Sequence, residues 1–455
     1  MKRWILVGLL LIIPQIIQAG EAPSPTAPTD AIKTEAPVPS ENPAGEVPLG
    51  QPMGTERVSN DIFEKKGGNI HPFLAITEYW TDNAFDTHSN QKSDFTTVIS
   101  PGIYLALPGM KERIRPIETL NITPGGSTLT RFGVQYPRVF QTYLYYRADI
   151  EHYLDSHELN YTSHTVEGVA QYNMRGGLSF EVDDQFVKSR TQRGTGFSFE
   201  LDKFYGNLFS ATAKYEIGDK TLVRVDYSNY YLHFIAPENR FRDRDDNTVS
   251  AYLFYKLWPK TALFVEYDYV DITYNQDVVS GSSEQHFFAG LKWDITDKTK
   301  GSIKAGYGIK DFNNSTVGSH SHNDLYVEIQ LDHKFSPKTT LLVRGSRKTE
   351  ETDVAQGNFI VADTIGTTLL HRFTTKVTGS LDLSYTNEKY NGVVTFGDET
   401  KALNDQYLRA GIAAQYEFKD WLKFDLGYVF SDRISNISAL SYINNTIYLR
   451  ASAIY

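Results

Sequence analysis

The feature that most constrains this chain is a repeated segment of about ten residues in which apolar and polar side chains alternate. An alternation with period two is the pattern of a β-strand. Helical periodicity appears nowhere at length, so the sequence predicts an all-β fold. About eighteen segments recur, at 71–82, 94–107, 140–154, 161–173, 177–188, 207–217, 221–234, 247–257, 261–274, 284–295, 299–311, 323–335, 339–349, 359–373, 375–388, 403–417, 421–433 and 442–455.

The connections between these segments alternate in length. One set consists of very short turns, such as Gly218-Asp219-Lys220, and the other of long polar loops, such as "NNSTVGSHSHND". An even number of strands with short turns at one end and long loops at the other is typical of an outer-membrane barrel. Ten residues also suit a tilted crossing of the bilayer. We therefore expect a transmembrane antiparallel up-and-down β-barrel of about 18 strands.

The two faces of a predicted strand differ in chemistry. In "LKFDLGYVF" the outward set includes Leu422 and Leu426, whereas the inward set includes Lys423 and Asp425. One such strand also suits a soluble sheet, but here nearly every strand has a polar face and no helix is predicted to cover the other. Lipid is then the covering for the apolar face, and closure into a barrel removes the unpaired strand edges.

Aromatic residues gather where the strands meet the short turns, as in an interfacial girdle. They are Tyr255, Trp258, Trp293, Phe335, Phe373, Phe418 and Trp421. The last strand, "NNTIYLRASAIY", ends on Tyr455 and also carries Ile447 and Leu449 on its apolar face. This strand resembles the C-terminal signal by which barrel-insertion machinery recognises outer-membrane proteins. We predict that Ile447, Leu449 and Tyr455 form that signal.

The first 69 residues have a different character. Residues 1–19 begin with Lys2 and Arg3, continue as an apolar run and end at Ala19, which predicts a cleaved secretory signal peptide. A membrane anchor is the alternative. Residues 20–69 are rich in Pro, Ala, Glu and Ser, too poor in apolar surface to fold, and predict a disordered periplasmic linker. Residues 70–455 are then the barrel, located in the outer membrane after cleavage of the signal peptide.

The composition excludes several classes of function. The net charge of −10 disfavours a partner bound through phosphate groups, so we expect no nucleic acid. The absence of Cys excludes disulfides, thiolate metal sites and Cys nucleophiles. No EF-hand, P-loop or dinucleotide motif is present. We expect no cofactor, no metal and no enzymatic activity.

Three polar clusters carry residue types that occur in active or metal sites. His152, His157 and His164 lie near two serines in the sequence, but no nucleophile-elbow motif accompanies them. The histidines of "GSHSHND" (318–324) fall in a predicted loop, whose spacing specifies no metal geometry. "RFRDRDD" (240–246) alternates in sign and predicts an exposed loop that pairs with itself. Polar loop residues are the simpler interpretation of all three.

The charged side chains on the inward faces are the candidate site. Buried unpaired charges are costly, so these groups either pair across strands or face water. A barrel of about eighteen strands is wide enough for an aqueous channel. The predicted pore-lining residues are Arg147, Asp149, Glu181, Asp183, Arg224, Asp226, Glu266, Asp268, Lys304, Glu328, Asp332, Arg344, Asp382, Arg409, Lys423, Asp425 and Arg450. Inward tyrosines, which offer stacking platforms to sugars or pack within the wall, are Tyr143, Tyr145, Tyr252, Tyr326 and Tyr407.

Three stretches, "SDFTTVISPGIYLALPG" (93–109), "SHELNYTSHTVEG" (156–168) and "DDQFVKSRTQRG" (183–194), resemble the bacterial Putative beta-barrel porin 2 family. The resemblance implies an outer-membrane barrel of Gram-negative bacteria, and many members are associated with exopolysaccharide production. It carries no catalytic motif. The segment between Pro108 and Pro137 is longer than the usual turn of the family, which leaves the strand count there open.

Two classes of function follow. The first is transport, either as a conduit for secreted exopolysaccharide or as a general diffusion porin for small hydrophilic solutes. The second is a plugged structural or adhesive barrel that acts through its surface loops. The expected partners are outer-membrane lipid, the barrel-insertion machinery, a polysaccharide solute and a periplasmic export partner within reach of the Pro-rich segment.

Overall fold

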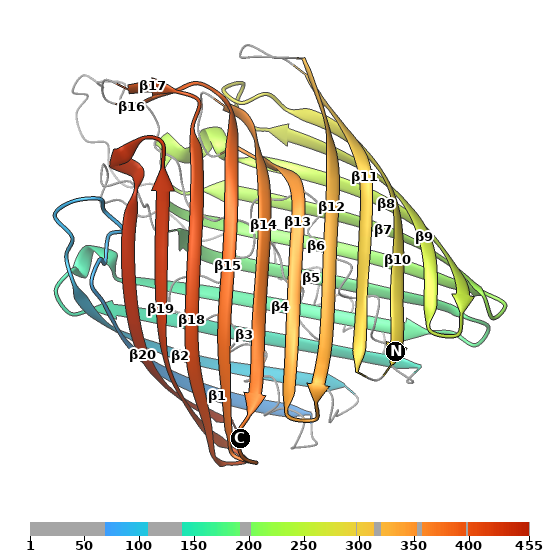
Figure 1. The fold of residues 1–455 in the computed structure, drawn as a ribbon, viewed down its shortest axis with the longest axis horizontal. Coiled ribbons are helices and arrows are strands. Elements are labelled where there is room, and N and C mark those ends of the chain that lie inside the picture. The colour runs from blue at the N-terminus through green and yellow to red at the C-terminus, as the bar shows by residue number, and fades with distance from the viewer. Residues whose placement is uncertain are drawn as a thin grey trace, which may run out of the picture. The chain divides into compact units, whose positions relative to one another are not determined.

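The computed structural model describes residues 69–107, 139–191, 202–296, 298–313, 320–352, 357–396 and 399–454. The predicted signal peptide, nearly all of the predicted linker, the long segment after Pro108 and Tyr455 lie outside these residues. Eighteen strands form one antiparallel sheet, as predicted. A separate hairpin, β16 (Val394–Phe396) and β17 (Glu399–Lys401), lies in the connection between β15 and β18 and was not predicted. Figure 1 shows this arrangement.

The barrel strands run close to the predicted segments, and several extend further toward the long loops. They are β1 (Ile70–Thr81), β2 (Asp94–Leu107), β3 (Phe140–Tyr153), β4 (Tyr161–Asn173), β5 (Leu178–Thr191), β6 (Asp202–Ile217), β7 (Thr221–Phe234), β8 (Arg244–Trp258), β9 (Thr261–Tyr274), β10 (Ser282–Thr296), β11 (Thr299–Phe312), β12 (Ser321–Ser336), β13 (Thr339–Glu351), β14 (Gly357–Arg372), β15 (Val377–Gly392), β18 (Asn404–Lys419), β19 (Leu422–Ser435) and β20 (Tyr442–Ile454).

The sheet closes on itself. Each barrel strand pairs with the strand before it and the strand after it in the chain, and β1 also pairs with β20, from Phe73↔Ile454 to Thr81↔Thr446. Every strand therefore has a hydrogen-bonded neighbour on both sides. This closure is what a lipid-exposed sheet needs, because the hydrocarbon core offers no partner to an unpaired backbone group.

The two faces of the wall are opposite in polarity. On β19 the Leu426 side chain is 56% exposed, whereas the adjacent Asp425 is 3% exposed. On β15, Leu381 and Leu383 are exposed and Asp382 between them is buried. Apolar side chains outside and polar side chains inside are the reverse of a soluble domain and the arrangement of a membrane barrel.

The short turns reverse the chain within a few residues, and some of those residues adopt positive φ angles. Gly176 and Gly177, between β4 and β5, have φ values of 101° and 87°, in the left-handed region that glycine adopts without steric cost. A side chain at Gly177 would also place its Cβ 3.0 Å from the carbonyl oxygen of Glu216. Six of the seven predicted girdle residues beside the short turns, Trp258, Phe335 and Phe373 among them, are exposed, and Trp293 is half-buried.

The opposite end carries the longer connections, with short 3-10 helices at η2 (His157–Leu159), η3 (Pro237–Arg242) and η4 (Ser438–Leu440). The prediction of an exposed loop over 240–246 is wrong: Arg242, Arg244 and Asp246 are buried. The physical reason is that β8 already begins at Arg244, so alternate side chains turn inward. Self-pairing is present, because Arg244 Nε lies 3.0 Å from Asp246 Oδ2.

Asp243 anchors this connection at the end of η3. Its carboxylate accepts a 2.7 Å hydrogen bond from the Phe234 backbone N–H and lies 2.7 Å from His233 Nδ1. Burial raises the pKa of Asp243 above its ordinary value, an effect that these hydrogen bonds oppose. No helix in the described part of the chain is long and apolar enough to cross a membrane.

Candidate functional site: the charged inner wall

All the predicted pore-lining residues are buried or half-buried in the structure. Along most strands they alternate with exposed apolar side chains, as in Arg224-Val225-Asp226 on β7. The period-two pattern thus places their charges on the inner wall. That they contact a moving solute stays a prediction.

One charge cluster spans β7 and β8. Arg224 Nε donates a 2.7 Å hydrogen bond to Asp226 Oδ1, two residues further along β7. The Arg224 guanidinium also lies over the Tyr252 ring of β8, 5.4 Å from its centroid. Residues two apart share a face of a strand, so the sequence spacing itself explains this pair.

A second cluster spans β9, β11 and β12. The Lys304 ammonium lies 2.7 Å from Glu266 Oε1 and 3.4 Å from Glu328 Oε2, and it sits 4.4 Å from the centroid of the Phe288 ring. Glu328 is the ladder partner of Lys304, but Glu266 lies two strands away. One cation therefore lies between two carboxylates and offsets the repulsion between them.

The other predicted residues are distributed around the wall and pair locally. Asp149 accepts from Arg147 Nε (3.0 Å) and Ser100 (2.6 Å), Arg344 lies 2.7 Å from Asp332, and Asp382 accepts from Thr368 (2.6 Å). Asp425 accepts from Gln415 (2.7 Å), and Lys423 lies 3.4 Å from Glu417. Asp268 lies 3.9 Å from His286 Nδ1. Arg450 stands opposite Asp425 in the ladder, Arg409 opposite Ser384, Glu181 opposite Gln171 and Asp183 opposite Val169.

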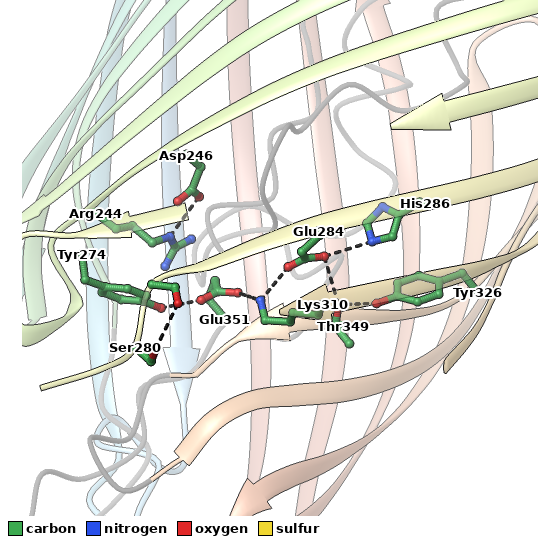
Figure 2. A network of polar contacts seen from close by, with 11 residues as sticks. Arg244, Asp246, Tyr274, Ser280, Glu284, His286, Lys310, Tyr326, Thr349 and Glu351 are labelled. Atoms are coloured by element: carbon green, nitrogen blue, oxygen red, sulfur yellow. Dashed lines mark hydrogen bonds and ion pairs between the residues drawn. The ribbon is translucent and has the colours of Figure 1, made fainter. Parts of the chain in front are cut away.

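A third cluster, absent from the predicted residues, lies near the ends of β11 and β13 that lead into the long loops. Figure 2 shows its contacts. Lys310 Nζ is 2.5 Å from Glu284 Oε1 and also binds the carboxylate of Glu351. Glu284 further contacts His286 Nε2 at 3.0 Å, and the Tyr274 hydroxyl donates to Glu351 Oε2 at 2.6 Å. The sequence alternation could have identified Lys310, because it lies six residues after Lys304 on β11 and therefore on the same inward face.

Two further buried ion pairs were also missed. Arg433 on β19 donates from Nη2 to Asp405 Oδ2 on β18 at 2.6 Å, and both side chains are fully buried. Arg190 on β5 binds Glu151 on β3 and lies over the Tyr153 ring, with β4 between the two strands. Arg433 and Asp405 were within predicted strands, but their pairing depends on which residues of the two strands face each other.

The inward tyrosines pack within the wall in most cases. Tyr143 donates to Glu167, Tyr326 hydrogen-bonds Thr349 at 2.7 Å, and Tyr407 lies beneath the Arg433 guanidinium. Tyr252 packs with Phe254 and Phe264. These four rings are buried, which favours the wall-packing interpretation over free stacking platforms.

Where the structure describes them, the histidines considered for catalysis or metal binding make local contacts. The Nδ1 atoms of His152 and His157 both contact the Tyr153 carbonyl oxygen, at 2.9 and 3.0 Å. His322 Nε2 lies 3.8 Å from Asp324 Oδ2, and His320 is exposed. Among the residues that the structure describes, no group of three or more His, Cys, Asp or Glu side chains is placed to hold a metal ion.

The predicted insertion signal lies on the outer face where it is described. Ile447 and Leu449 are exposed on β20, and they alternate with the buried Tyr448 and half-buried Arg450. Recognition of these side chains by insertion machinery stays a prediction.

A search of curated proteins finds no match to this chain. Among solved structures, the chain is similar to OccAB4 of Acinetobacter baumannii, at 8% identity over 86% of this chain and 99% of that chain, with a TM-score of 0.44. It is similar to the outer membrane protein opdK of Pseudomonas aeruginosa, at 8% identity over 85% and 98%, with a TM-score of 0.45. It is also similar to the siderophore receptor PirA of Pseudomonas aeruginosa, at 9% identity over 86% and 81%, with a TM-score of 0.41.

The family comparison is more direct. The model of a family described as Putative beta-barrel porin 2 matches residues 142–453, well over half of the chain and most of the barrel. It agrees with the resemblance seen in the sequence, and with a closed 18-stranded wall that is apolar outside and polar inside. The chain therefore belongs to the Putative beta-barrel porin 2 family and is a porin-like β-barrel of the outer membrane.

Proposed function

We propose that this protein is a conduit through which a secreted exopolysaccharide crosses the outer membrane, and that it catalyses no covalent step. The observation that carries the proposal is the inner wall, where carboxylates and cations from nearly all strands lie among buried aromatic and aliphatic side chains. A polar wall lets a hydrated chain exchange hydrogen bonds with water for similar ones with protein, at little cost in either direction.

The charged side chains of the inner wall are already paired with one another, which favours passage of a solute over its tight binding. Lys304 is shared by Glu266 and Glu328, and Arg224 is held by Asp226, so these groups already have partners. A neutral polymer would meet dipoles and paired charges, which bind it weakly along its length. The polymer itself is suggested by the family resemblance, not by a sugar-binding constellation.

A diffusion porin for small hydrophilic solutes is the second candidate. The observation that favours it is the packing of the inward tyrosines into the wall, which leaves polar groups rather than exposed rings as the solute contacts. A plugged barrel that acts through its surface loops is the third, and it differs from both in conducting no ions.

The proposal implies several partners. Lipid covers the apolar outer face, and the insertion machinery receives the last strand. A periplasmic export partner would deliver the polymer, and residues 20–69 could meet it. No nucleic acid and no cofactor take part.

Deletion of the gene, followed by measurement of surface polysaccharide, tests the proposal. We expect surface polysaccharide to fall and to return when the wild-type gene is supplied at a matched level of barrel protein. Unchanged export together with altered uptake of small solutes would assign the protein as a diffusion porin. Unchanged export and uptake, with no conductance in lipid bilayers, would assign it as a structural barrel.

A further inference from the structure

The C-terminal end of β13, which leads into the connection to β14, departs from the barrel wall. The ladder between β12 and β13 runs from Ser336↔Thr339 only to Val327↔Arg347, whereas β13 stays paired with β14 as far as Glu351↔Phe359. β14 in turn stays paired with β15 up to Gly357↔Gly392. The end of the β13–β14 hairpin is therefore joined to the wall on the β15 side and separates from β12 on the other.

The side-chain contacts show where this end of the hairpin lies. Glu351 of β13 binds Lys310 of β11 and accepts a 2.6 Å hydrogen bond from Tyr274 of β9 (Figure 2). In the wall, β10, β11 and β12 separate β9 from β13, a distance of about 19 Å at a strand spacing of ~4.8 Å. A glutamate and a tyrosine cannot span that distance along the wall. Glu351 must therefore lie over the inner face of β9–β11.

Further contacts hold the hairpin in this position. Thr349 meets the Tyr326 hydroxyl of β12 at 2.7 Å and Glu284 Oε2 of β10 at 3.5 Å. From β14, the Phe359 ring stacks on Phe312 of β11 with 5.7 Å between centroids. Phe312, Phe359 and Val361 form one buried apolar cluster. Together with the Tyr274 contact, these join the hairpin to β9, β10 and β11, none of which is a ladder partner of β13 or β14.

Lys310 is the charged centre of this contact. Its side chain has no exposed surface and is bound by one carboxylate from the wall, Glu284, and one from the hairpin, Glu351. Removal of the Lys310 cation would leave the buried carboxylates of Glu284 and Glu351 without it, which is strongly unfavourable, whereas removal of the Glu351 charge would leave Lys310 paired with Glu284 alone. The attachment of the hairpin to the wall therefore depends on a few side chains, each of which can be substituted singly.

We propose that residues 348–351 of β13 and 357–360 of β14, here called the strap, form a gate inside the lumen that the Glu351–Lys310 contact latches to the inner wall. In the latched position the strap lies in the path of a solute, and release of the latch moves it back toward the β15 side, where its backbone pairing is retained. This inference rests on the proposed function, since a gate matters only in a barrel that conducts.

Single-channel recording of the full-length protein in planar bilayers tests the latch. Glu351→Gln removes the charge of the strap, and Lys310→Met removes its partner. We expect each to raise the ratio of open to closed time by about tenfold or more, because each removes the buried ion pair between the strap and the wall. Glu399→Gln is the matched control, since Glu399 also pairs with a lysine, Lys401, but both side chains are exposed in the β16–β17 hairpin. It should leave gating as in the wild type.

A covalent tether provides a second measurement if Lys310→Met fails to fold. The chain contains no Cys, so a Glu351→Cys/Lys310→Cys variant carries only the two introduced thiols. Joined by a short cleavable thiol cross-linker, it should stay in the low-conductance state until the linker is cleaved. Folded barrels in which Glu351→Gln gates as the wild type, or in which cleavage changes nothing, would overturn the gate and leave the conduit intact. Absence of conductance from all variants, including the cleaved tether, would instead reject the conduit.

Discussion

At the scale of single residues, the inner and outer faces respond to charge in opposite ways because their surroundings differ. The outer face meets hydrocarbon, which solvates no ion, whereas the inner face already holds charges with partners. Adjacent residues of one strand therefore give the sharpest comparison, since local backbone and position along the chain are almost the same.

Leu426→Arg and Asp425→Asn form such a pair on β19. Leu426 is exposed on the outer face, so an arginine there should impair insertion by roughly 2–4 kcal/mol if the site lies near the midplane. Asp425→Asn keeps a group that can bond Gln415 and should be tolerated, with at most a change in ion selectivity. The yield of heat-modifiable barrel in membranes measures both. Similar yields for the two variants would show that the assignment of faces in β19 is wrong.

The buried ion pairs predict a different response from the exposed ones. Arg433→Met would leave Asp405 buried without its cation and should lower the free energy of unfolding by about 3–5 kcal/mol. Lys401→Met removes the partner of Glu399 in a pair whose side chains are 48% and 42% exposed, and should cost at most ~1 kcal/mol. Urea unfolding of refolded barrels in detergent compares them. Equal losses of stability in the two variants would contradict the difference in burial.

At the scale of elements, the barrel depends on the contact between its first and last strands. Besides the ladder between β1 and β20, the connection after β1 is held to β20 by side chains. Asp82 accepts hydrogen bonds from the Asn445 backbone N–H (2.7 Å) and Nδ2 (2.6 Å), and Asn444 Nδ2 donates to the Asn83 carbonyl oxygen (2.9 Å). These contacts fix the register in which the barrel closes.

Deletion of residues 446–455 should therefore abolish insertion. It removes the ladder to β1 and most of the ladder to β19, and leaves two strand edges with unpaired backbone groups in lipid. Tyr455→Ala alone should reduce insertion if the terminal aromatic residue is part of the signal. Membrane fractionation and heat-modifiability measure both effects. Wild-type levels of barrel after the deletion would refute the requirement for closure by β20.

At the scale of the whole molecule, the predicted order is signal peptide, linker and barrel. Cleavage after Ala19 should give a mature protein that begins at Gly20, because the basic start, apolar run and small residue match the requirements of signal peptidase. N-terminal sequencing of the outer-membrane fraction measures this. Recovery of a chain that still begins at Met1 would favour the membrane-anchor alternative.

The sequence by itself determined the fold class, the approximate number of barrel strands and the polarity of each face. These features are local: alternation with period two sets the face of each residue, and turn length sets the end at which a strand reverses. Asp382 between Leu381 and Leu383 could be placed on the inner wall without any knowledge of its neighbours in space. The prediction for residues 240–246 was wrong because their alternating charges were interpreted as an exposed loop, whereas β8 already begins at Arg244.

Only the tertiary structure decided which inner charges meet. Glu351 lies 41 residues from Lys310 and 77 from Tyr274 in the chain, and β12 lies between β13 and β11 in the wall. Such contacts depend on where β13 separates from β12 and on how far the hairpin leans inward. Both result from the sum of many packing and hydrogen-bonding contacts across the barrel, and a pattern confined to one strand contains no record of them.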